Sequence, residues 1–162
     1  MFILKTTSWQ IFLMVFLPLM ISAIVTDFLI GSILEIISYN ILFGWFLLVG
    51  KNLNEQLNDD EIRPDTFFII NCFYLIVFSS IASIMNNGRE SEMPMIVLLL
   101  TVYFAFAFFY VVYFTAQSFL SMQEIKSRKS SQYSDQLVFL YFFIFIVGIW
   151  FIQPRINEYF KS

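Results

Sequence analysis

Two acidic side chains, Asp27 and Glu35, lie within a stretch of sequence that is otherwise strongly apolar. A carboxyl group in such a setting is a candidate for carrying a proton or binding an ion, because an ionised group among hydrocarbon normally faces water or a protein partner. If the chain turns between the two residues, both lie at a boundary that water reaches, and a proton relay loses its support. If the turn lies elsewhere, Glu35 is the best candidate for an ion or proton site.

A second set of polar side chains recurs at helical spacing. Tyr103, Tyr110 and Gln117 are seven residues apart, so they share one face of a helix. This stripe predicts either a helix contact, in which the small Ala107 allows close approach and the polar tips bond across the interface, or the lining of a path for an ion or solute. Asn71, in another apolar stretch, could complete either arrangement.

Segment 51–66 is acidic. A hard cation needs several oxygen ligands on a tight loop. The spacing does not match an EF-hand loop, and no glycine supplies its sharp turn, so a solvated acidic loop is the favoured interpretation. The five acids are Glu55, Asp59, Asp60, Glu61 and Asp65.

The missing residue types limit the chemistry further. The chain has no histidine and a single cysteine, Cys72, in an apolar stretch where it is expected to act as a small filler. Histidine-ligated haem, histidine-containing zinc sites, imidazole-activated nucleophiles and thiolate clusters are therefore excluded within this chain. No glycine-rich phosphate loop or G-x-S-x-G segment occurs. We expect neither catalysis nor a cofactor.

The composition indicates the medium of the protein. Hydrophobic residues make up 59% of the 162 positions and charged residues 13%, against about 25% charged in a typical soluble domain. Such a chain cannot coat a soluble globule with polar groups, so it is predicted to be an integral membrane protein with lipids as partners. The net charge is −3 and no basic stripe occurs, so no nucleic-acid partner is expected.

The elements that must position these residues are predicted to be membrane-spanning helices. The fold class is all-α, a polytopic transmembrane helical bundle forming one domain over residues 1–162. As a single helix, the apolar block 9–50 would be about 60 Å long, twice the hydrocarbon thickness of about 30 Å, so it must turn, and we place the turn between Thr26 and Ser32. Five spans are preferred: 9–26, 32–50, 67–85, 95–120 and 136–152.

The boundaries have specific signals. The fourth span should begin after Pro94, since proline suits a first helical turn. The fifth should end where Gln153, Pro154 and Arg155 follow a run of apolar residues, as the chain leaves the bilayer. A re-entrant first block, leaving four segments, is the alternative. The first 23 residues partly resemble a signal peptide, but their apolar stretch exceeds the usual 7–15 residues, so we expect retention.

Lysine and arginine predict the orientation. With five spans, six of these residues fall on the side of the N-terminus and three on the other, so the N-terminus is expected in the cytoplasm and the C-terminus outside. The cluster Lys126, Arg128 and Lys129 is either part of this signal or a contact for anionic lipid headgroups at about 1 kcal/mol per cation.

The C-terminal half also resembles a family. The segments FFYVVYFTAQSFLSMQE, YSDQLVFLYFF and GIWFIQPRIN, within residues 108–157, are similar to an uncharacterised family of small multi-span bacterial membrane proteins with an I-W-x-I-Q-P-R-I-N-like ending. Gln117 stands where that family tends to carry lysine. The resemblance implies a bacterial inner (cytoplasmic) membrane location and supplies no activity or catalytic residue.

Two functions from different classes follow. The first is a non-catalytic membrane subunit or scaffold that packs against a partner membrane protein or, as a homo-oligomer, against copies of itself. The second is a small channel or transporter, in which Tyr103, Tyr110, Gln117 and Asn71 line a path and Glu35 supplies selectivity. The lack of a catalytic set favours the first. A lipid-handling enzyme that uses the acidic segment with a divalent cation is a third hypothesis.

Overall fold

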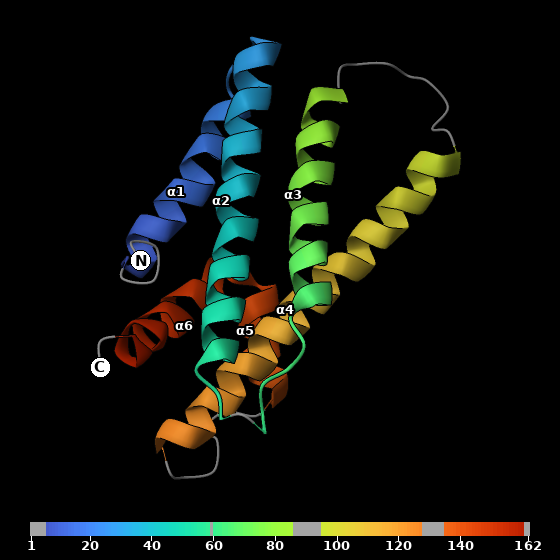
Figure 1. The fold of residues 1–162 in the computed structure, drawn as a ribbon. Coiled ribbons are helices and arrows are strands. Elements are labelled where there is room, and N and C mark those ends of the chain that lie inside the picture. The colour runs from blue at the N-terminus through green and yellow to red at the C-terminus, as the bar shows by residue number, and fades with distance from the viewer. Residues whose placement is uncertain (1–5, 59, 86–94, 128–134, 161–162) are drawn as a thin grey trace.

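The computed structural model describes residues 6–58, 60–85, 95–127 and 135–160. These residues form helices and no strand, so the predicted all-α helical bundle is confirmed (Figure 1). The helices of the described chain are α1 (Ser8–Ser22), α2 (Phe28–Glu55), α3 (Thr66–Met85), α4 (Met95–Ser127), α5 (Asp135–Phe143) and α6 (Phe145–Tyr159).

The first apolar block turns as predicted, but a few residues earlier. A capping box between Thr7 and Gln10 starts α1, which ends at Ser22. The Asp27 carboxylate accepts a hydrogen bond from the backbone N–H of Ile30 at 3.1 Å, and this cap starts α2 at Phe28. The 15 residues of α1 extend about 22 Å, which falls short of the crossing expected for 9–26.

Three helices are long and apolar enough to cross a membrane: α2, α3 and α4. The predicted segment 67–85 lies within α3, and α4 begins at Met95, where a span was expected to begin. Both α2 and α4 continue past the predicted ends at 50 and 120, so their last turns carry polar residues beyond the apolar block. By length and composition the described residues give three spans, or four if the bent pair α5–α6 counts as one.

The C-terminal segment differs from its prediction. A bend of 115° separates α5 from α6, at Ile144 with φ −90° and ψ 67°. The prediction that the helix ends at Gln153 is wrong, because α6 continues through Pro154 to Tyr159. Gln153 was expected to need water. Instead its side chain is fully buried and bonded to protein groups.

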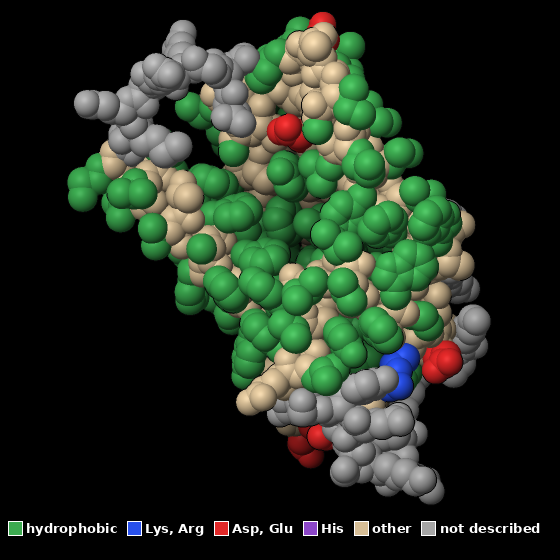
Figure 2. Space-filling model, turned by 180° about the vertical axis from the view of Figure 1, so that it is seen from behind, with side chains coloured by type: hydrophobic (Ala, Val, Ile, Leu, Met, Phe, Trp, Pro, Cys, Tyr) green, Lys and Arg blue, Asp and Glu red, His purple; other side chains and the backbone are tan. Residues whose placement is uncertain are grey.

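The long helix α2 lies at the centre of the bundle, in contact with α1, α3 and α4 (Figure 1). Its lower half packs large rings, including Trp45 and Phe46, against Phe142 and Phe145 of the C-terminal pair. On the face that Figure 2 shows, apolar side chains cover the middle, acidic ones lie toward both ends and basic ones toward the lower end. This distribution suits a molecule surrounded by lipid over its middle.

Candidate functional site

The polar side chains inside the helices bond from helix to helix. The Ser32 hydroxyl donates to the carbonyl of Ser83 at 2.9 Å, joining α2 to α3. Ser38 of α2 donates to the carbonyl of Val15 in α1. Because lipid offers no competing hydrogen bonds, such contacts help to hold membrane helices together.

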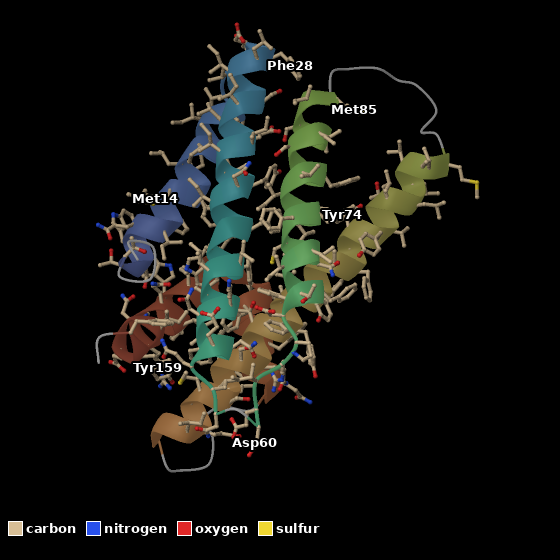
Figure 3. All side chains as sticks on the ribbon, in the orientation of Figure 1. Met14, Phe28, Asp60, Tyr74, Met85 and Tyr159 are labelled. Atoms are coloured by element: carbon tan, nitrogen blue, oxygen red, sulfur yellow. The ribbon has the colours of Figure 1, made fainter. Side chains whose placement is uncertain are left out.

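The predicted stripe on α4 is divided between different surroundings. Tyr103 donates to the Asn71 side-chain oxygen at 3.0 Å, so the structure brings these two residues together across α3 and α4. The neighbouring Tyr74 donates to the Leu100 carbonyl at 2.7 Å and lies between the same helices (Figure 3). Tyr110 packs edge-on against Phe67, with ring centroids 4.9 Å apart.

The remaining candidates of that set lie elsewhere. Gln117 is half-buried further along α4. Glu35 lies on α2 between Ser32 and Asn40, whose partners on α3 are Ser83 and Ser80. Asn71 is nine residues before Ser80 on α3, about 13 Å along the helix axis. Glu35 is therefore not brought together with Asn71 and Tyr103.

The charged candidates outside the apolar stretches form no metal site in the described chain. Within the part of the chain that the structure describes, no group of three or more His, Cys, Asp or Glu side chains could hold a metal ion. Glu55 pairs with Lys51 at 3.6 Å, and both side chains are well exposed. Asp59, Arg128 and Lys129 lie outside the described residues; Lys126 falls in the last turn of α4.

A buried polar cluster that the sequence analysis missed joins the two ends of the chain. It consists of Thr6, Trp45, Gln153 and Asn157, and is called the Gln153 cluster below. The Gln153 side-chain oxygen accepts from the Trp45 indole N–H at 3.0 Å. Its amide nitrogen donates to the Thr6 carbonyl at 3.1 Å and to the Asn157 side-chain oxygen at 2.9 Å. Asn157 donates to the same Thr6 carbonyl at 3.0 Å.

The Gln153 cluster satisfies all the hydrogen-bonding groups of a side chain with no exposed surface. That full pairing matters, because an unpaired polar group in an apolar interior costs about 1–3 kcal/mol. The spacing of Gln153 and Asn157, four residues apart in the sequence, puts both amides on one helix face. That spacing was the available sequence signal.

A second unpredicted feature is a cavity of about 380 Å³, open to the surface, where α3 begins beside α4. It is called the Arg63 cavity. Its described lining is an arginine, a proline and four aromatic residues: Arg63, Pro64, Phe67, Tyr110, Tyr113 and Phe114.

The Arg63 backbone is fixed from the end of α2. The Asn54 amide donates to the Arg63 carbonyl at 2.8 Å, and its oxygen accepts from the Arg63 N–H at 3.1 Å. The Arg63 side chain donates through Nη2 to the Ser121 hydroxyl at 3.3 Å. The other terminal nitrogen, Nη1, is buried and has no hydrogen-bond partner within the described chain.

Fold, composition and polar interior define this chain as a membrane-embedded, all-helical protein. Comparisons with protein families, with characterised proteins and with solved structures found no match. The function is therefore argued from the chain's own residues.

Proposed function

We propose that the protein is a non-catalytic subunit or scaffold of a bacterial inner membrane, which packs in the bilayer against a partner membrane protein or against copies of itself. The observation that supports this proposal is that polar side chains of the helices form hydrogen bonds within the chain. Ser32, Ser38, Tyr103 and Gln153 each make a hydrogen bond to a different element of the chain. These bonds stabilise helix packing and leave these groups engaged rather than free for a substrate.

The first half of α4 supports an intermolecular role. In Figure 1 this part of α4 diverges from α3. Its large side chains point away from the bundle on several faces; the most exposed are Met95, Ile96, Leu98, Leu99, Val102 and Phe106, at 52–76%. A helix that contacts its own bundle on so little of its surface offers the rest to a neighbouring helix.

The test is photo-crosslinking in native membranes. A benzophenone amino acid would replace Leu99, which is 60% exposed on α4. The matched control is Leu29, which is 70% exposed on α2. The scaffold proposal expects a protein adduct of defined mass from position 99, either a dimer or one identified partner, and none from position 29. Lipid adducts alone at both positions would contradict it.

A small channel or transporter is the second candidate, favoured by the bend between α5 and α6. Broken helices build the binding sites of many transporters. In this chain, however, aromatic rings pack at the bend, with the Trp45 and Phe145 centroids 5.1 Å apart. Ion or solute flux in reconstituted vesicles separates the two functions. Flux in the wild type that is lost in both Glu35→Gln and Gln117→Leu would replace the scaffold with a transporter.

The Gln153 cluster also favours a topology that differs from the sequence-based one. With nine residues, α5 extends only about 13 Å, too short to cross the bilayer. After the bend, α6 returns to Thr6, which lies just before the start of α1. We therefore propose that α5–α6 is a re-entrant hairpin and that both ends face the cytoplasm.

The charge distribution supports this topology. Of the nine Lys and Arg residues, only Arg89 then belongs to the far side, and the other eight belong to the cytoplasmic side. Eight Lys and Arg residues against one is a stronger asymmetry than the six against three of the five-span topology. The positive-inside rule therefore favours the topology with both ends in the cytoplasm.

A further inference from the structure

The Arg63 cavity lies at the start of the apolar helix α3, beside α4. Arg63 belongs to the connection between α2 and α3, next to the charged ends of those helices. Phe67 and Tyr113 line the same cavity and are 45% and 54% exposed, so it opens on the surface that lipid contacts. Its volume of about 380 Å³ suits a headgroup and the start of a chain rather than a whole lipid.

The Arg63 guanidinium has no acidic partner within residues 6–58, 60–85, 95–127 and 135–160. Among the residues that the structure describes, Arg63 forms no ion pair, although Glu61 and Asp65 flank it in sequence. Its Nη1 is buried and has no acceptor among the described residues, and Arg63 is one of the residues that line the cavity. A guanidinium suits phosphate oxygens, which can accept two parallel hydrogen bonds from it.

The site is built before a ligand arrives. Asn54 holds the Arg63 backbone through both of its polar groups, and Ser121 of α4 orients the side chain. Stacked rings of Phe68 and Phe114, with centroids 4.3 Å apart, fix the wall behind the cavity. A preorganised donor loses less entropy on binding than a freely moving surface arginine.

We propose that the Arg63 cavity binds one anionic phospholipid, with the phosphate on the Arg63 guanidinium and the upper acyl chain against Phe67, Tyr110 and Tyr113. The charge selects an anion, and the apolar walls select a lipid over a free phosphate ion. This inference requires the membrane location only and is independent of the scaffold proposal.

The test uses the full chain purified in mild detergent and titrated with phosphatidylglycerol or phosphatidylcholine, with bound lipid counted by native mass spectrometry. The wild type should retain one phosphatidylglycerol in preference to phosphatidylcholine. Arg63→Gln should bind phosphatidylglycerol about tenfold more weakly. Lys51→Gln removes the same charge at the same end of the bundle, at a side chain paired with Glu55, and should bind like the wild type.

A second pair of variants leaves Arg63 in place, so the proposal remains testable if Arg63→Gln does not fold. Tyr113→Ala removes a cavity wall and should weaken phosphatidylglycerol binding about threefold. Phe73→Ala removes a ring of similar exposure, 55%, that does not line the cavity, and should have no effect.

Three results would overturn the proposal. Equal binding by the wild type, Arg63→Gln and Tyr113→Ala would mean that the cavity holds no lipid. Equal binding of both phospholipids by the wild type would remove the role of the charge. Displacement of the lipid by millimolar inorganic phosphate would assign the site to free phosphate.

Discussion

Gln153 shows how a polar residue can remain in a membrane-embedded core. Its amide is paired with Trp45, Asn157 and the Thr6 carbonyl, so no polar group of the side chain is left to the surrounding hydrocarbon. A glutamine whose side-chain oxygen and nitrogen are both paired in this way contributes specificity, because a shift of α6 would leave several groups unpaired at once.

For this single residue, we predict that Gln153→Leu destabilises the protein. The change leaves the buried Trp45 indole N–H without its acceptor, so the free energy of unfolding should fall by about 1–3 kcal/mol. Thermal or denaturant unfolding in detergent measures it. Gln56→Leu, at an exposed position just after α2, is the matched control and should change stability little.

A double-mutant cycle separates pairing from packing. Trp45→Phe together with Gln153→Leu removes donor and acceptor, so the double variant should lose less stability than the sum of the single variants. Strict additivity would mean that the hydrogen bond contributes nothing beyond the volume of the two side chains.

The α5–α6 pair shows how one glycine permits an element to bend. A Cβ added at Gly148 would lie 1.6 Å from the Tyr141 carbonyl oxygen, well inside any allowed contact. The two helices can therefore approach at this angle only because residue 148 has no side chain. The bend in turn positions Gln153 beside Trp45.

We predict that Gly148→Ala opens the bend and strongly destabilises the protein, because the obstructing atom is backbone and cannot rotate aside. The control is Gly44→Ala on α2, where an added Cβ meets nothing within 4 Å. That change should raise stability by about 0.5–1 kcal/mol, since alanine is the better helix former. Unfolding temperatures of the two variants give the comparison. Equal behaviour of both would rule out a close contact at Gly148.

At the scale of the whole molecule, the chain is a bundle around α2 with its two ends brought together by the Gln153 cluster. The short α1 and the bent α5–α6 pair each cover part of the bilayer depth. The hydrogen bonds from α6 to Thr6 would not form between five independent spans. If α5–α6 is re-entrant, both ends lie on one side only when α1 together with residues 23–27 brings the chain to the far side, so that α1, α2, α3 and α4 pass between the two sides four times.

Reporter fusions test this topology. A fluorescent protein that matures only in the cytoplasm should be bright at either end of the chain, and alkaline phosphatase, which is active only outside, should be inactive at both. Phosphatase inserted in 86–94 is the positive control and should be active. An active phosphatase at the C-terminus would restore the five-span model with the C-terminus outside.

The fold class could be predicted from composition, because a helix that spans the membrane must present apolar side chains to the lipid along its whole length. That rule predicted the long apolar runs that form α3 and α4. The proline before Met95 also marked the residue at which α4 begins. Asp27 could be placed near a turn, because the apolar block 9–50 is too long for one crossing and the polar Asp27 interrupts it. These are local properties, so the sequence was sufficient.

The candidate sites depended on contacts that no local pattern encodes. The stripe of Tyr103, Tyr110 and Gln117 was visible, but only the packing of α3 on α4 decided that Tyr103 meets Asn71 while Glu35 lies elsewhere. The Arg63 cavity requires residues from two helices and their connection. Such sites could not be predicted, since partners far apart in the sequence are chosen by tertiary packing.

Segment 148–160 shows which properties the sequence determined and which the tertiary structure decided. By itself, the sequence determined that the chain is helical, apolar and suited to lipid, because these follow from side-chain chemistry summed over about 20 residues. Whether Gln153 meets water or protein depends on what lies opposite it, and only the tertiary structure decided that. It placed Trp45 and the Thr6 carbonyl there, and their hydrogen bonds supply what water would otherwise provide.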